Sequence, residues 1–368
     1  MRIRLIFILF VLLVIELNAS AQESPFVFTH LKENDGLGDN IVNCFLKDSR
    51  GILWIGTYNG FNRYDGSNFF VYKKRKGASS MINEVVHSLC VDTKGSIWGS
   101  TDNGVFCFEP IKDKFINYTI RSVDKGKTFY KIICDKQGSI WAIGLWSLLK
   151  YNADKKEFED EFMPTNNRDS AEYFQIRKNG VVMDPSGKGF WLATRAGIMY
   201  FEIAKRTFFH CQNQLNDSLF KKRSASAICL SPTGKIWFFN NDQKEIISFD
   251  PNSRKILQRI SIKNEVPEAE GATIFEDNNH RLWFSSLTYH LLLIDLANNN
   301  KIIELKHEQD GDRTVATQFF WDILQDEYGT IWLELMQEFQ DVILKETFIR
   351  NIIYRKRSRN WQRLLFYI

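Results

Sequence analysis

The stretch DSRGILWIGTYNGFNRYDG, residues 48–66, contains two β-rich runs, ILWIGT and FNRYD, joined by a glycine turn. It opens on a D-x-x-G turn, in which the Asp can bond its own backbone and the Gly accepts positive φ. The run IVNCFLK precedes this stretch and the run NFFVYKK follows it. Four short strands within about 46 residues are typical of one β-propeller blade.

The core of this stretch recurs along the chain. Further copies begin at Asp92, Asp135, Asp184, Ser231, Asp277 and Asp326. Their tryptophans are Trp54, Trp98, Trp141, Trp191, Trp237, Trp283 and Trp332, separated by 44, 43, 50, 46, 46 and 49 residues. Helical repeats would need a 3.6-residue apolar period, which is missing. The sequence therefore predicts an all-β, seven-bladed propeller with four-stranded blades over residues 22–335.

A residue that recurs at the same position of every blade is expected to pack in the contact between that blade and the next. We therefore expect the repeat tryptophans and the turn aspartates to be structural. The chain ends are expected to close the ring. PFVFTHLKENDGLGDN, residues 25–40, parallels the fourth-strand segment NFFVYKKRKGASSMINE, residues 68–84. The N-terminal segment should therefore supply the outer strand of the last blade, which leaves no open sheet edge.

The first 21 residues have the pattern of a signal peptide. Arg2 and Arg4 precede an apolar run over residues 5–17, and Ala19, Ser20 and Ala21 offer small residues for cleavage. The run is short for a bilayer span and carries Glu16, which favours a cleaved signal over a membrane anchor. We expect an exported, periplasmic protein cleaved near Ala21.

Composition limits the partners. A net charge of +4 over 368 residues gives no concentrated basic face, so no nucleic-acid partner is expected. None of the six cysteines forms a C-x-x-C pair or lies near a His at zinc-site spacing. Buried free thiols are expected, although an exported compartment permits disulfides. No metal or cofactor is predicted.

The segment DGLGDNIVNCFLKDSRGILWIGTYNGFNRYDG, residues 35–66, with its weaker copies as far as Trp332, resembles the two-component regulator propeller repeat. That repeat occurs in periplasmic sensors of hybrid histidine kinases from Bacteroidetes-type bacteria, which regulate polysaccharide use. The resemblance implies oligosaccharide sensing, and full-length relatives that dimerise and span the inner membrane. No phosphoacceptor helix or nucleotide-binding box is found here, so phosphotransfer is not expected of this chain.

Residues 336–368 depart from the repeat. After Trp332 the pattern predicts a glycine turn and another strand, but the chain continues ELMQEFQDVILKETFI. A one-base shift of the frame, with a permissible choice of codons, restores the repeat at this point. We therefore expect a truncated sensor with a non-native tail produced by a frameshift; a divergent last blade or a helical cap are the alternatives.

Function is expected where the repeats differ, at the start of the innermost strand of each blade. The position five residues before the turn residue holds Asn43, His87, Tyr130, Asn179, Ser226, Ala272 and Trp321. Residues that follow the second strand should lie on the same face: Tyr58, Asp102, Trp146 and Arg195. Flat rings, hydrogen-bonding groups and a few charges are the mix that a sugar site needs. The predicted ligand-binding residues among them are Asn43, Tyr58, His87, Asp102, Tyr130, Trp146, Arg195 and Trp321.

Two other functions remain open. The turns also resemble those of sialidases and streptogramin lyases, so a propeller lyase or glycoside hydrolase is one alternative. An enzyme would need a carboxylate pair, or a His with a metal, at the channel mouth, and only His87 and Asp102 qualify. No catalytic motif such as G-x-S-x-G or H-E-x-x-H occurs. The other alternative is a propeller that docks protein across its face.

Overall fold

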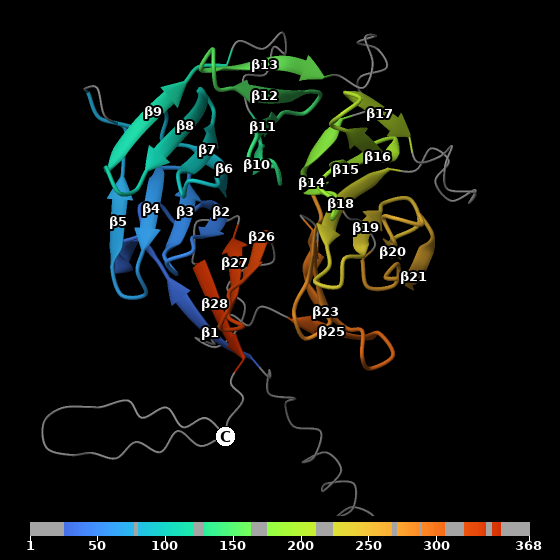
Figure 1. Ribbon diagram of the computed structural model, residues 1–368. Helices are drawn as coiled ribbons and strands as arrows, with labels where there is room; N and C mark the ends of the chain where they lie inside the picture. The colour runs from blue at the N-terminus through green and yellow to red at the C-terminus, as the bar shows by residue number, and fades with distance from the viewer. Residues whose placement is uncertain are drawn as a thin grey trace, which may run out of the picture.

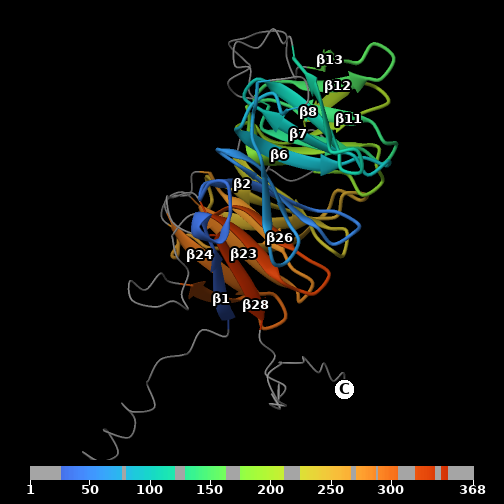
Figure 2. The same ribbon diagram turned by 90° about the vertical axis from the view of Figure 1, so that its left-hand side faces the viewer.

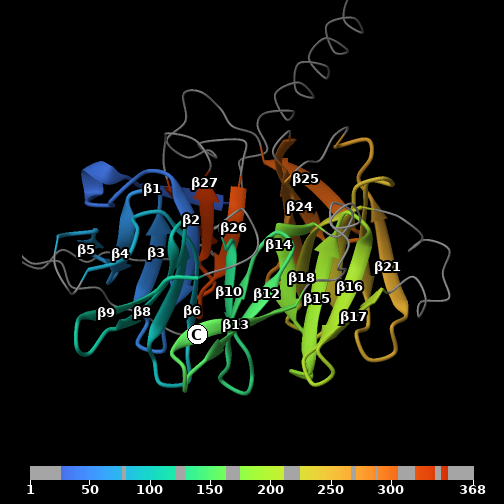
Figure 3. The same ribbon diagram turned by 90° about the horizontal axis from the view of Figure 1, so that it is seen from above.

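The computed structural model describes residues 26–76, 80–120, 129–162, 175–210, 224–266, 271–286, 289–305, 320–335 and 341–346. Within these ranges, seven four-stranded antiparallel sheets surround a central channel (Figure 1). The predicted all-β fold with seven blades is confirmed. Seen from above, the outer strands β5 and β21 lie at the two sides, with the inner strands β10 and β26 between them (Figure 3).

The first strand of each blade is innermost and the fourth is outermost. Blade 1 consists of β2 (Val42–Lys47), β3 (Leu53–Thr57), β4 (Gly60–Tyr64) and β5 (Phe69–Tyr72). Blade 2 consists of β6 (Val86–Val91), β7 (Ile97–Thr101), β8 (Gly104–Glu109) and β9 (Lys114–Tyr118). Blade 3 consists of β10 (Lys131–Cys134), β11 (Ile140–Ile143), β12 (Leu148–Asn152) and β13 (Glu157–Phe162).

The next three blades repeat this order. Blade 4 consists of β14 (Ile176–Met183), β15 (Gly189–Thr194), β16 (Gly197–Glu202) and β17 (Thr207–His210). Blade 5 consists of β18 (Ala225–Leu230), β19 (Ile236–Asn240), β20 (Glu245–Phe249) and β21 (Ile256–Ser261). Blade 6 consists of β22 (Thr273–Glu276), β23 (Arg281–Ser286), β24 (Tyr289–Asp295) and β25 (Lys301–Leu305).

Blade 7 joins the two ends of the described chain. It contains β26 (Phe320–Gln325), β27 (Ile331–Leu335), β28 (Asp341–Glu346) and, on the outside, β1 (Phe26–Leu31). β1 pairs with β28 over all six residues, antiparallel, and Figure 2 shows the two strands side by side. The predicted closure by the N-terminal strand is confirmed. A short 3-10 helix, η1 (Glu33–Asp35), then leads from β1 toward blade 1.

The third strand of blade 7 corrects the expected domain boundary. We expected the propeller to end at residue 335, but residues 341–346 pair with β27 on one side and β1 on the other. The physical reason is that both neighbours present unpaired backbone groups, which a strand between them satisfies. The propeller therefore extends to residue 346. The signal peptide and residues 347–368 lie outside the described ranges, and the origin of the tail by a frameshift stays a prediction.

Each of the seven contacts between neighbouring blades contains one repeat tryptophan. Seven separate clusters of buried apolar side chains fill these contacts. Going from the blade 1–2 contact round to the blade 7–1 contact, they contain Trp54, Trp98, Trp141, Trp191, Trp237, Trp283 and Trp332. All seven indoles are at most 9% exposed. This arrangement agrees with a packing role for the repeat tryptophans.

The turn aspartate satisfies the one polar atom of this indole. In blade 1, Trp54 Nε1 donates to Asp48 Oδ2 at 3.0 Å, while Asp48 Oδ1 accepts the backbone N–H groups of Arg50 and Ile52. Burial opposes ionisation of Asp48, but these bonds and the Arg50 guanidinium hold its pKa below the ordinary value. Equivalent indole bonds occur in blades 2, 3, 4, 6 and 7. The aspartates therefore fix turn and tryptophan together.

Blade 5 obtains its acceptor from the neighbouring blade. Ser231 replaces the turn Asp, and its hydroxyl bonds to Thr233 instead. Trp237 Nε1 donates to Glu276 Oε2, which belongs to β22 of blade 6. Glu276 is 1% exposed and also lies 3.6 Å from Lys235 Nζ. The indole N–H of Trp237 therefore still donates to a carboxylate, but this carboxylate belongs to a strand of the next blade.

Removing this carboxylate should destabilise the propeller. We expect Glu276→Ala to lower the free energy of unfolding by about 1–3 kcal/mol for the stranded indole N–H alone. The double variant Ser231→Asp/Glu276→Ala should recover most of the loss, because it restores the acceptor used by the other six blades. Urea denaturation of the three proteins measures both effects.

The single variant Ser231→Asp is the matched control. It places a second carboxylate beside buried Glu276 and should destabilise by repulsion. Equal stability of the Glu276→Ala and double variants would show that Glu276 does not act as the acceptor for Trp237.

Candidate functional site

One end of the central channel collects the starts of the inner strands and the ends of the second strands. Strand register shows this directly, because Val42 lies opposite Thr57 in blade 1 and Val86 opposite Thr101 in blade 2. The D-x-x-G turns connect the opposite ends of these strands and therefore lie on the other face. We call the first end the channel mouth.

A β-bulge presents the variable residue in several inner strands. In blade 1, Val42 pairs with Thr57 and Cys44 with Gly56, so Asn43 is the extra residue. His87 and Ser226 are the extra residues of β6 and β18 in the same way. Bulges break the alternation of a strand and re-aim a side chain without moving the rest of the sheet. This is the local reason why Asn43 and His87 face the channel.

Blade 1 also shows how tightly the strands behind the bulge are packed. A Cβ added at Gly56 would lie 2.6 Å from Cys44 Sγ and 2.7 Å from a methyl carbon of Val86. Only glycine fits at this position, because any side chain would push blade 1 away from blade 2. Here the backbone of blade 1 packs directly against the Val86 side chain of blade 2.

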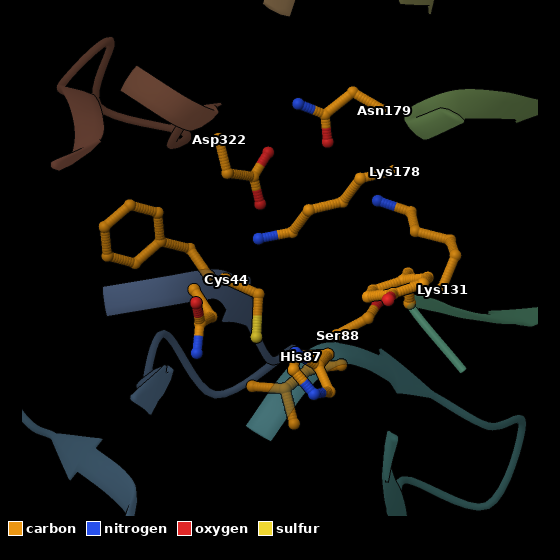
Figure 4. A pocket seen from close by; sticks show the side chains of 11 residues that line it. Cys44, His87, Ser88, Lys131, Lys178, Asn179 and Asp322 are labelled. Carbon is orange, nitrogen blue, oxygen red and sulfur yellow. The ribbon is translucent and has the colours of Figure 1, made fainter. Parts of the chain in front are cut away.

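The inner strands enclose a cavity at the channel mouth (Figure 4). The cavity volume is about 20 Å³, and its outer part is open to solvent. The lining side chains come from blades 1, 2, 3, 4 and 7: Asn43, Cys44, Phe45, His87, Ser88, Leu89, Tyr130, Lys131, Lys178, Asn179 and Asp322. A water molecule needs roughly 10–15 Å³ of such space, so the cavity suits one small polar group of a sugar rather than a whole ring.

The structure brings four of the seven predicted ring residues together. Asn43, His87, Tyr130 and Asn179 all line the cavity. The ring residues of blades 5 and 6 do not reach it. Ser226 is buried and bonds to Asn241 of its own blade, and Ala272 is buried in the contact between blades 5 and 6. The side chain of Trp321 lies outside the described part of the chain.

A hydrogen bond from Asn179 separates the cavity from the inner strands of blades 5 and 6. Its Nδ2 donates to Thr273 Oγ1 of blade 6 at 2.7 Å. This bond joins blade 4 to blade 6 past blade 5, so the channel is bridged at this level. The cavity therefore belongs to one side of the propeller.

The four predicted rim residues differ in their surroundings. Tyr58 is 50% exposed, and Arg195 is exposed. Asp102 bonds to a cavity residue, His87, at 2.7 Å. Trp146 is half-buried, and its indole Nε1 has no hydrogen-bond partner among the described residues. Only Asp102 contacts a residue of the cavity wall through a hydrogen bond that the structure records.

His87 and Asp102 form the most specific polar pair at the mouth. His87 is 8% exposed, whereas the Asp102 side chain is 43% exposed. Because a carboxylate only accepts, His87 Nε2 carries the hydrogen and Nδ1 is left as an acceptor. Burial lowers the pKa of His87, and the nearby Lys178 lowers it further, although Asp102 opposes both.

Tyr130 extends this pair toward blade 3. Its ring lies edge-on to the His87 imidazole with the ring centres 5.7 Å apart. Burial raises the pKa of the Tyr130 hydroxyl, and the charge of Asp102 adds to the effect. The mouth therefore offers a neutral imidazole, a neutral phenol and an exposed carboxylate within one small area.

Sequence analysis missed three charged lining residues: Lys131, Lys178 and Asp322. Each is adjacent to a ring position that was predicted. In blade 4, residues 177–180 lie opposite a single residue of β15, and in blade 7 residues 321–322 lie opposite a single residue of β27. A longer bulge exposes more than one residue to the channel. Charged residues next to a ring position in the sequence are therefore the feature that could have predicted these lining residues.

Other chemistry is limited in the described ranges. They contain no group of three or more His, Cys, Asp and Glu side chains arranged to hold a metal ion. They also contain no helix with the length and apolarity needed to cross a membrane. Cys90, Cys107, Cys134 and Cys229 are free thiols, and burial raises the pKa of Cys107 and Cys229 to about 12. Cys211 lies outside the described part.

Fold and cavity together define a seven-bladed β-propeller with a polar site at one end of its channel. Residues 36–59 match the family described as two component regulator propeller. A 76-residue segment is 40% identical to histidine kinase P4 of Formosa agariphila, covering 21% of this chain and 5% of that protein. The first repeat of the chain thus matches the two-component regulator propeller family that its sequence resembled.

Solved structures share the fold. The extracellular domain of BT3049 from B. thetaiotaomicron, assigned to a hybrid two component system, is 17% identical with a TM-score of 0.64, covering 87% of this chain and 42% of that one. Virginiamycin B lyase from Staphylococcus aureus is 16% identical with a TM-score of 0.63, covering 87% and 99%. The chain therefore spans less than half of the sensor domain it resembles and almost the whole length of the lyase.

The lowered pKa of His87 should make stability depend on pH. The folded state binds this proton less readily than the unfolded state, whose His has the ordinary value of 6.5. The stabilising contribution is therefore present above about pH 6.5 and is lost as the pH falls through the lowered pKa. Between pH 7.5 and pH 5, we expect wild type to lose more unfolding free energy than His87→Gln.

Urea denaturation at several pH values measures this difference, and other acid-sensitive groups cancel because they are common to both proteins. Parallel stability curves for the two proteins would mean that His87 is not held neutral by its surroundings.

Proposed function

We propose that this chain is the extracytoplasmic ligand-sensing propeller of a hybrid two-component system, and that it detects oligosaccharides without transforming them. The observation that carries the proposal is the convergence of four variable ring residues on one cavity. Residues that recur in all blades fill the contacts between blades, whereas residues that differ line the cavity. Such a division is expected of a recognition site on a repeat scaffold.

The chemistry of the mouth supports a sugar ligand. The phenol of Tyr58 is half-exposed at the rim and the ring of Tyr130 lies at the wall. Both offer flat apolar faces with a polar end. Asn43, His87 and Asn179 add amide and imidazole groups that bond hydroxyls. Flat faces beside hydrogen-bonding groups are the combination that a pyranose ring requires.

Location and partners follow from the resemblance. The structurally similar B. thetaiotaomicron proteins are described as extracellular domains, and the first 21 residues have the pattern of a signal peptide. We therefore place the propeller in the periplasm, as part of a dimeric receptor whose full-length form spans the inner membrane. Nucleic acid is not a partner of this chain in the proposal.

Titration against a panel of oligosaccharides tests the proposal. We expect at least one member to bind, and Tyr58→Ala to weaken its Kd roughly three- to ten-fold through the lost ring contact. Tyr328→Ala is the matched control, because Tyr328 is 83% exposed but lies in the D-x-x-G turn of blade 7 on the opposite face. Calorimetry measures each Kd.

Absence of binding across the panel would contradict the proposal. Equal losses in the Tyr58→Ala and Tyr328→Ala variants would place the ligand away from the mouth.

A lyase or glycoside hydrolase is the second candidate. Two observations favour it: the similarity to virginiamycin B lyase over nearly that protein's whole length, and the His87–Asp102 pair, which leaves Nδ1 of a neutral imidazole as a general base. If the propeller is an enzyme, incubation with a bound oligosaccharide yields shortened products, and His87→Ala abolishes them while retaining binding. We expect the bound sugar to be recovered intact, as mass spectrometry will measure.

A further inference from the structure

The charged side chains of the cavity come from three different blades. Lys131 belongs to β10, Lys178 to β14 and Asp322 to β26. Figure 4 shows Lys178 and Asp322 reaching toward one another across the cavity, with Lys131 to one side. Two ammonium groups and one carboxylate therefore share the space. His87 adds no charge at neutral pH, because burial keeps its imidazole uncharged.

A buried donor beside these cations lacks a partner. Asn43 is 6% exposed and lines the same cavity. Its Nδ2 has no hydrogen-bond partner among the described residues. A buried donor in this condition is unfavourable, and an acceptor on a bound molecule removes that cost. Asn43 therefore marks a place where the cavity is prepared for an acceptor that the chain itself does not supply.

We propose that the cavity binds the carboxylate of an acidic sugar unit, so that the receptor senses a uronic-acid-containing oligosaccharide. The inference rests on the proposed function and specifies its ligand class. Lysine ammonium groups and Asn43 Nδ2 only donate, while a carboxylate offers about four acceptor positions and a full negative charge. Charge-assisted hydrogen bonds of this kind are roughly twice as strong as neutral ones.

The change in affinity when Asp322 is neutralised distinguishes a charged ligand from a neutral one. Among the side chains that line the cavity, the ammonium groups outnumber the carboxylates by one, and Asp322 reduces the attraction for an anion, as Asp102 beside His87 also does. If the ligand carries a carboxylate, neutralising Asp322 strengthens binding. If instead Asp322 accepts hydrogen bonds from the hydroxyls of a neutral sugar, the same substitution weakens binding.

The experiment titrates the chain with uronic acid disaccharides, each beside its own methyl ester, which has the same skeleton without the charge. Digalacturonate, a glucuronate disaccharide and a mannuronate disaccharide form three such pairs. We expect one acid to bind at least roughly ten-fold more tightly than its ester. Lys178→Gln and Lys131→Gln should each weaken the acid roughly ten-fold and leave the ester unchanged. Asp322→Asn should strengthen the acid.

Three results would overturn the inference while leaving the proposed function standing. These are esters that bind as tightly as their acids, an Asp322→Asn variant that weakens every ligand, and a sulfated sugar that binds where no uronate does. If neither the acids nor the neutral oligosaccharides of the wider panel bind, the proposed function itself fails. Circular dichroism of each variant confirms that the propeller remains folded.

Discussion

The hydrogen bond from a repeat tryptophan to a buried carboxylate holds together the turn, the strand and the contact between blades. An indole packs well between two sheets, but its N–H would be stranded there without an acceptor. The turn aspartate supplies the acceptor in six blades, and in blade 5 Glu276 supplies it from blade 6. The substitution at blade 5 shows that the constraint is the buried N–H. Which strand or turn supplies the acceptor is secondary, provided that a carboxylate reaches the interface.

The same blade plan leaves one place free to vary. Behind the bulge, residues such as Trp54 and Gly56 are fixed by contacts with the next blade. At the bulge, the side chain leaves the regular alternation of the strand, and in blades 1 and 2 it faces the channel. Asn43 and His87 occupy this place in two successive blades, and Tyr130 lies directly before β10 in the third. Stability and recognition are therefore carried by residues only a few positions apart in each strand.

The spacing of the tryptophans predicted the blades because each blade packs against the next through one tryptophan at the same strand position. It also predicted Asn43 and His87 at the cavity, since a fixed offset from the turn reaches the bulge. Lys178 and Asp322 were missed because bulge length differs among blades, and no turn residue reports it. The strand at residues 341–346 was missed because its segment lacks the repeat pattern. Its pairing is decided by β27 and β1, two neighbours distant in sequence.

The cavity depends on closure of the ring. Asp322 lies in blade 7, whose outer strand is the N-terminal β1. Lys47 of blade 1 ties this blade in place through Asp326 at 3.2 Å and Glu327 at 2.8 Å. Both bonds lie at the turn end of the strands, opposite the mouth, so they hold the base of the blade 7–1 contact while the cavity lies at its other end. Any opening at this contact would separate Asp322 from Asn43 and would remove the cavity wall that blades 7 and 1 form together.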